Sequence, residues 1–132
     1  MNRSIISLVM ALIIILPGCM TTDTEQENPF HGDFIDSRDV NDFDLITSDN
    51  QSYNFQQETE NKVVIIAFLF TNCYDICPIV TYNLGMIHDT RTQSQKESIE
   101  FLTITVDPWR DNITTLNEWK LATQSNWTHL TI

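Results

Sequence analysis

Positive charge is scarce in this sequence. Its 132 residues include 7 Lys and Arg against 18 Asp and Glu, which gives a formal net charge of −11 at pH 7. A chain with this balance repels nucleic acid and anionic lipid head groups, so the composition argues against a nucleic-acid-binding protein. It attracts cations or a partner with a basic surface, although an acidic surface can equally serve solubility alone.

A hydrophobic run long enough to cross a membrane is also missing. The apolar stretch "IISLVMALIIIL" at residues 5–16 is shorter than the run of about 20 residues that a spanning helix needs. Because it follows Arg3 and precedes "LPGC", it is typical of a secretory signal that ends in a prokaryotic lipoprotein processing site. We therefore expect a lipoprotein-type signal over residues 1–18 and a lipid on Cys19, or else an uncleaved N-terminal anchor. Either arrangement places the remaining chain outside the cytoplasm, at a membrane.

The remaining chain is expected to form a tether and one folded domain. Residues 19–33 are polar and acidic and contain a proline, as linkers often do. The length leaves room for a single small domain over residues 34–132, and a hydrophobic content of 42% can supply its core.

Strands and helices are predicted to alternate in this domain. The pattern predicts a hairpin at 43–55, strands at 62–70, 99–107 and 127–132, and helices at 78–92 and 112–124. The run "KVVIIAFLF" is typical of a strand that is buried on both faces in the middle of a sheet. The order indicates an α/β fold with a mainly parallel sheet and right-handed crossovers. Because the last strand stops at the final residue, we expect the C-terminal part of the domain to be missing.

Cysteine is also rare, and two cysteines remain once Cys19 is assigned to the anchor. Cys73 and Cys77 are separated by three residues, and Pro78 follows directly. They come after a predicted buried strand and before a predicted helix, where parallel α/β sheets place their ligand and active sites. A helix N-terminus also favours negative charge, so a thiol there loses its proton more easily. The position therefore favours chemistry at this pair.

Three interpretations of the pair stay open from the spacing alone. Two buried cysteines or one static disulfide would suit an exported protein. A dithiol that cycles between reduced and oxidised forms is the second interpretation. The third is a metal site, because thiolates select copper(I) or zinc. Two cysteines are too few for a closed four-ligand zinc site, whereas copper(I) accepts two or three ligands.

Two motifs resemble the Sco/SenC family of thioredoxin-fold proteins, which is tied to copper delivery for cytochrome c oxidase. They are "FLFTNCYDICP", which contains the cysteine pair, and "FLTITVDPWRD" further along the chain. The resemblance covers residues 34–132. It implies a thioredoxin-like α/β fold with a central, mainly parallel sheet, an N-terminal hairpin and flanking helices, and with the final hairpin and helix missing.

The resemblance also implies the site. Cys73 and Cys77 are expected to be copper ligands when reduced and to form a disulfide when oxidised. The family's third ligand is a distant histidine, which we expect beyond residue 132. No histidine ligand is therefore assigned among those present, which are His31, His88 and His129.

The function implied is that of a membrane-tethered, extracytoplasmic copper-binding protein that delivers copper to cytochrome c oxidase or assists its assembly. Its partner is expected to be the oxidase copper subunit or another thiol or copper protein. The alternative is an enzyme, a thiol–disulfide oxidoreductase in which Cys73 attacks a partner disulfide and Cys77 resolves it. A plain interaction module with a fixed disulfide is a third hypothesis.

Three further expectations concern residues near the two motifs. Asp75 is expected to cap the start of the helix that follows the cysteines. Asp107 and Arg110 are expected to form an ion pair or to shape the turn after their strand. The three tryptophans are expected to be buried or half-exposed packing residues; they are Trp109, Trp119 and Trp127.

Overall fold

The computed structural model describes residues 32, 33, 35, 36 and 38–132. The chain divides into two compact units, Met1–Arg38 and Asp39–Ile132, and the described residues of the first unit contain no helix or strand. No helix of the described residues is long and apolar enough to cross a membrane. All the elements below belong to the second unit.

The N-terminal features predicted from the sequence lie outside the described residues. They are the signal at 1–18, the lipidation site Cys19 and the tether at 19–33, of which the structure describes residues 32 and 33 alone. Each of them therefore stays a prediction.

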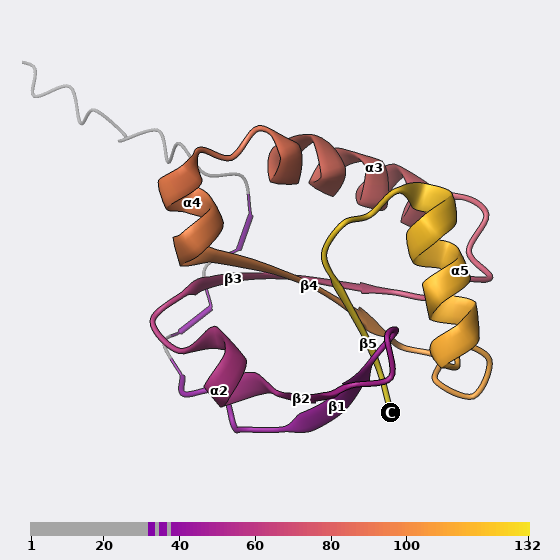
Figure 1. Cartoon of the computed structure of the whole chain (residues 1–132), viewed down its shortest axis with the longest axis horizontal. Helices are drawn as coiled ribbons and strands as arrows, with labels where there is room; N and C mark the ends of the chain where they lie inside the picture. The colour runs from indigo at the N-terminus through magenta and orange to yellow at the C-terminus, as the bar shows by residue number, and fades with distance from the viewer. Residues whose placement is uncertain (1–31, 34, 37) are drawn as a thin grey trace, which may run out of the picture. The chain divides into compact units, whose positions relative to one another are not determined.

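The second unit alternates strands and helices, as the sequence predicted. The elements are β1 (Asp44–Thr47), β2 (Ser52–Asn54), α2 (Phe55–Thr59), β3 (Val63–Leu69), α3 (Ile76–Asp89), α4 (Gln93–Ser98), β4 (Ile99–Thr105), α5 (Ile113–Thr123) and β5 (Thr128–Thr131) (Figure 1). The short helices α2 and α4 are additions to the predicted order. Pro78 occupies the third position of α3, within the first turn, where its missing N–H group costs nothing.

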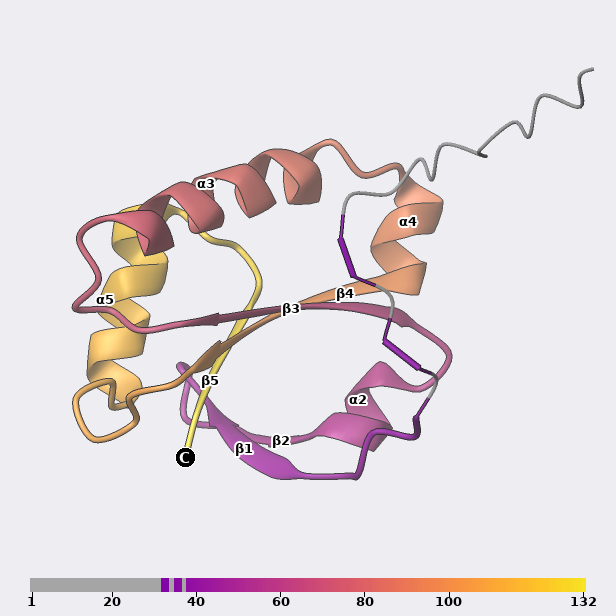
Figure 2. The ribbon, with the colours of Figure 1, turned by 180° about the vertical axis from the view of Figure 1, so that it is seen from behind.

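The five strands form one sheet in the order β2-β1-β5-β4-β3. Strand β4 runs parallel to both β3 and β5, whereas β1 is antiparallel to both β2 and β5. In both views of the ribbon, α3 lies on one side of β3 and β4, and the β1–β2 hairpin with α2 lies on the other (Figures 1 and 2). The predicted α/β class with an N-terminal hairpin is confirmed, and the sheet of the described residues is mixed, because β3, β4 and β5 are parallel whereas β1 and β2 pair in antiparallel fashion.

The predicted position of β3 in the middle of the sheet is wrong for the described residues. Strand β3 pairs with β4 alone and so forms an edge. Its residues Val63 and Phe68 are 64% and 67% exposed, whereas Leu69 is buried. A continuous apolar run indicates a strand that can be buried on both faces, but it carries no information about which neighbours cover it.

The core has two clusters, and the cysteines belong to one of them. Tyr53, Phe55, Leu102 and Leu130 form the first, which joins the hairpin and α2 to β4 and β5. Leu69, Cys73 and Cys77 form the second, with Phe70 and Trp119 packed against it. The second cluster therefore fixes the cysteine pair between the end of β3, the start of α3 and one face of α5.

The three tryptophans fall into two groups. Trp127 is buried and Trp119 is half-buried, in agreement with the packing role expected for them. The expectation is wrong for Trp109, which is 89% exposed in the loop between β4 and α5. Pro108 and Trp109 lie in a turn that Arg110 closes by donating its backbone N–H group to the Asp107 carbonyl, so the indole projects from a turn rather than from an element packed on the core.

Candidate metal and redox site

Cys73 and Cys77 lie at the end of the sheet where β3 and β4 finish. The loop at residues 70–75 leaves β3 and enters α3, with Cys77 as the second residue of that helix. Next to this loop, the backbone N–H group of Val106 donates to the Leu69 carbonyl at 2.9 Å, which holds the ends of β3 and β4 together. The site therefore occupies the carboxyl ends of parallel strands, as the sequence predicted.

The structure brings the two cysteines into contact. The backbone N–H group of Cys77 donates to the Cys73 sulfur at 3.3 Å. The side chains of both residues are free thiols, and the residues are 8% and 6% exposed respectively. The pair is largely covered, yet each residue keeps a small exposed surface.

The Cys73 sulfur, rather than the Asp75 carboxylate, accepts a backbone N–H group at the start of α3. Asp75 occupies the capping position but its side chain accepts no capping hydrogen bond, so the predicted role is wrong. Its backbone angles, φ −115° and ψ −88°, depart from the extended conformation that a capping residue usually adopts. As a result, an N–H group in the first turn of the helix points at the Cys73 sulfur.

The two thiols differ in acidity. The pKa of Cys73 is lowered, chiefly because it is hydrogen-bonded to the Cys77 side chain and also because backbone N–H groups of Cys77, Asp75 and Ile76 stabilise its thiolate. The pKa of Cys77 is raised, first by burial, then by its hydrogen bond to Cys73 and by the negative charges of Cys73 and Asp111. Cys73 is therefore the thiol that ionises first.

A buried carboxylate that sequence reasoning missed lies beneath this loop. Asp111 is 0% exposed. It accepts hydrogen bonds from the Thr71 backbone N–H group at 2.9 Å, from the Thr71 hydroxyl at 2.5 Å and from the Thr105 hydroxyl at 2.6 Å. Both Thr71 and Asp111 are within the two motifs quoted above, so the motifs marked the right segments without revealing that these side chains meet. The nearby ion pair between Asp107 and Arg110 is present, as predicted.

No histidine joins the pair in the part of the chain that the structure describes. His129 is buried in β5, where its Nε2 atom lies 2.7 Å from the Ser125 hydroxyl. His88 lies near the end of α3 and packs against Phe101 and Trp127. His31 lies outside the described residues. Within those residues, no group of three or more His, Cys, Asp or Glu side chains could hold a metal ion together.

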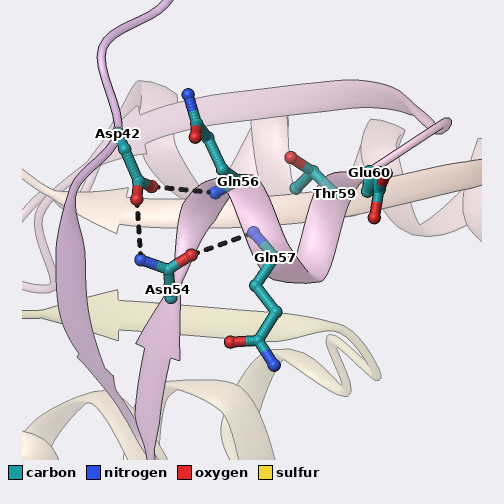
Figure 3. Close-up of a pocket in the computed structure, with 6 residues that line it drawn as sticks. All are labelled: Asp42, Asn54, Gln56, Gln57, Thr59 and Glu60. Carbon is teal, nitrogen blue, oxygen red and sulfur yellow. Dashed lines mark hydrogen bonds between the residues drawn. The ribbon is translucent and has the colours of Figure 1, made fainter.

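A surface pocket lies elsewhere on the molecule. It has a volume of about 640 Å³ and lies beside β2 and α2, with Asp42, Asn54, Gln56 and Glu60 among its lining residues (Figure 3). The Asp42 carboxylate accepts hydrogen bonds from the Asn54 side chain at 2.9 Å and from the Gln56 N–H group at 3.0 Å. These hydrogen bonds link Asp42 to the start of α2, so the carboxylate has a structural role that requires no ligand. No cysteine or histidine lines this pocket.

Comparisons with known proteins agree with this geometry. A family model described as SCO1/SenC matches residues 36–131. A SCO1/SenC family lipoprotein from Bacillus anthracis str. Ames is 27% identical, with a TM-score of 0.62, over 70% of this chain and 56% of that one. Copper-bound Sco1 from yeast is 30% identical, with a TM-score of 0.61, over 69% and 57%.

A third solved structure adds a redox observation on a relative. BsSco, described as a member of the Sco family of cytochrome c oxidase assembly proteins in which a disulfide switch was identified, is 23% identical, with a TM-score of 0.58, over 70% of this chain and 54% of that one. At this identity the likeness supports the fold. The chain spans little more than half the length of these relatives. No curated protein matches the chain.

Proposed function

The chain belongs to the SCO1/SenC family, and from this premise we propose that it binds copper(I) as a cargo between Cys73 and Cys77. The observation that carries the proposal is the contact between the two cysteines at the start of α3, where the Cys77 N–H group reaches the Cys73 sulfur at 3.3 Å. Thiolates are soft ligands that select copper(I), and a helix N-terminus stabilises them. The copper bound to yeast Sco1, a relative, supports copper as the metal.

Copper(I) suits the pair better than zinc. A structural zinc site is almost always completed by four ligands, and in the described residues no third histidine, cysteine or carboxylate stands beside the two sulfurs. Copper(I) is held by fewer, softer ligands. Its further ligand is expected to be a histidine beyond residue 132 or a group supplied by the partner that receives the metal.

Loading and release follow from the acidity of the two thiols. Both must be reduced, and each gives up its proton as a sulfur–copper bond forms. Cys73 is the first ligand, because its thiolate is already stabilised by hydrogen bonding to Cys77 and to backbone N–H groups. Cys77 is the second ligand, because its raised pKa keeps the thiol protonated until the bound copper ion offsets the negative charge of its thiolate. Transfer then proceeds by exchange of these thiolates for ligands on the partner.

The proposal extends to the place and the partner of this activity. A lipoprotein-type signal at residues 1–18, a lipid on Cys19 and a tether at 19–33 would hold the domain at 34–132 on the extracytoplasmic side of a membrane. The apolar run followed by "LPGC" and the lipoprotein relative from Bacillus anthracis support this arrangement. The partner is the copper subunit of cytochrome c oxidase or another thiol or copper protein. The net charge of −11 argues against nucleic acid.

A thiol–disulfide oxidoreductase is the second candidate, and the difference in acidity between the thiols favours it. The Cys73 thiolate would attack a partner disulfide, and Cys77 would then attack the mixed disulfide and release the partner as a dithiol. The chain would be left with a Cys73–Cys77 disulfide. A disulfide switch has been identified in BsSco, another member of the Sco family.

Anaerobic titration of the reduced chain with copper(I), followed by native mass spectrometry, tests the proposal. We expect one copper per chain and its loss in Cys77→Ala. The control is Met86→Ala, which truncates an exposed side chain further along α3 and should leave copper binding intact. A wild-type chain that holds no copper would refute the proposal. If that chain instead reduces insulin disulfides with turnover, the oxidoreductase function replaces it.

A further inference from the structure

Asp111 is a buried carboxylate that forms no ion pair within the described residues. Its neighbour Arg110 is turned toward Asp107, so the partners of the Asp111 carboxylate are three neutral donors supplied by Thr71 and Thr105. Burying a charge is costly unless hydrogen bonds replace the lost water. The Asp111 carboxylate is 0% exposed and accepts three hydrogen bonds, so its position in the fold is fixed.

The three donors come from two different parts of the molecule. The Thr105 hydroxyl belongs to the last residue of β4, which is part of the sheet. The Thr71 N–H group and hydroxyl belong to the loop, two residues before Cys73. The backbone of Asp111 is itself held, because its carbonyl accepts a hydrogen bond from the Thr131 hydroxyl of β5 at 2.9 Å. The carboxylate thus joins the sheet to the cysteine loop.

We propose that Asp111 is a positioning residue for the cysteine pair, which it holds in place by fixing Thr71 at the start of the loop that carries Cys73. The proposal rests on the proposed copper function and adds to it a residue whose carboxylate is hydrogen-bonded to Thr71 and Thr105 rather than to either sulfur. Among the hydrogen bonds of the described residues, the two from Thr71 to Asp111 are those that connect residues 70–75 to the segment between β4 and α5. Without these two hydrogen bonds, the position of Cys73 would be set by the conformation of its own loop alone.

Side chains that orient metal ligands have a measurable effect on affinity. Removing such a partner typically weakens metal binding by about 10–100-fold. Replacing Asp111 itself would remove the acceptor of three donors, of which the Thr105 hydroxyl is buried, and could prevent folding. The sharper variants are therefore at its partners, because Thr71→Val and Thr105→Val each remove one hydroxyl donor to the same carboxylate at similar volume.

The two variants are compared by competition for copper(I) with a chromogenic chelator. We expect Thr71→Val to bind copper(I) about tenfold more weakly than wild type and Thr105→Val to stay within about twofold of it. Amide hydrogen exchange on the metal-free chain gives a second measurement. It should show faster exchange at residues 72–75 in Thr71→Val alone, whereas both variants lose thermal stability. Thr71→Ser, which restores the hydroxyl, should recover the affinity.

The outcomes separate the positioning role from the copper function. Equal losses of affinity in both valine variants would make Asp111 a general stabiliser of the fold and overturn the inference. Unchanged affinity and exchange in Thr71→Val would overturn it as well. If the wild type binds no copper(I) at all, the copper function fails, and the exchange comparison still decides whether Asp111 holds the loop.

Discussion

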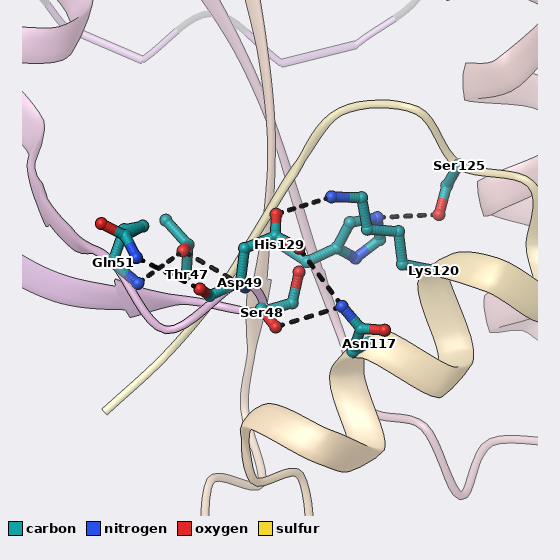
Figure 4. A network of polar contacts seen from close by, with 8 residues as sticks. All are labelled: Thr47, Ser48, Asp49, Gln51, Asn117, Lys120, Ser125 and His129. Atoms are coloured by element: carbon teal, nitrogen blue, oxygen red, sulfur yellow. Dashed lines mark hydrogen bonds and ion pairs between the residues drawn. The ribbon is translucent and has the colours of Figure 1, made fainter.

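His129 is the most unusual single residue of the described unit. It is 0% exposed in β5, with its Nε2 atom on the Ser125 hydroxyl and, within the described residues, no hydrogen-bond partner for Nδ1. Burial, together with the positive charge of Lys120, lowers its pKa to about 4, although Asp49 partly opposes this effect. Figure 4 shows the imidazole beside the ion pair of Lys120 and Asp49, which lies at 2.9 Å. His129 is therefore a neutral core residue at neutral pH.

Acidification should destabilise the fold through His129. In the unfolded chain this imidazole takes up a proton near pH 6.5, and in the folded chain near pH 4. Between these values the unfolded state binds more protons, so stability falls as the pH drops from 6.5 to 4, by up to about 3 kcal/mol. Urea unfolding at a series of pH values measures the slope. His129→Gln should flatten it, and an equally steep slope in that variant would assign the effect to other groups.

The candidate site could be predicted in part from single residues. The contact between Cys73 and Cys77 follows from their spacing and from their place between a strand and a helix. The link from Thr71 to Asp111 could not be foreseen, because it joins residues 40 positions apart and neither residue carries a local signal for a partner. The capping role expected for Asp75 failed because the loop conformation turns the Cys73 sulfur, rather than the carboxylate, toward the start of α3.

Elements were predictable where the hydrophobic pattern is long, as in β3, β4 and α3. Helix α5 has a weaker pattern, since Leu121 is 71% exposed, and its start is marked by the Asn112 cap. The short helices α2 and α4 have no such pattern and are defined by their caps instead. Thr92 and Gln95 form a reciprocal capping box at the start of α4, a signal of the T-x-x-Q type that the sequence does carry. The edge position of β3 could not be predicted, because pairing partners are a property of the whole sheet.

The end of α5 offers a test at the scale of one element. Gln124 terminates the helix in the left-handed conformation, with φ 55° and ψ 32°, and its side chain is exposed. Glycine adopts this conformation without steric cost, so Gln124→Gly should raise the free energy of unfolding by roughly 0.5–1 kcal/mol. Urea denaturation gives the value. The control, Ala122→Gly in the last turn of the same helix, should lower it by about 1 kcal/mol. If both variants had a lower free energy of unfolding than wild type, the left-handed conformation of Gln124 would not be a source of strain.

At the scale of the whole molecule, the sheet has an open edge. Within the described residues β3 pairs with β4 alone, and Phe68 is 67% exposed on that edge strand. An unpaired strand with exposed apolar side chains is a template for pairing with another chain. The net charge of −11 opposes such contacts over the molecule as a whole, but Val63–Leu69 contains no charged residue. The strand therefore lacks the charged side chains that would most directly prevent its edge from pairing with another chain.

We therefore expect the 132-residue chain to self-associate through β3 as its concentration rises. Phe68→Lys places a charge on the edge strand and should shift the association midpoint to about tenfold higher concentration. Sedimentation velocity over a wide concentration range measures the shift. Leu121→Lys makes the same change of charge at an exposed apolar side chain of α5, so it should leave the midpoint close to that of wild type. If both variants shift it equally, net charge rather than the β3 edge controls the association.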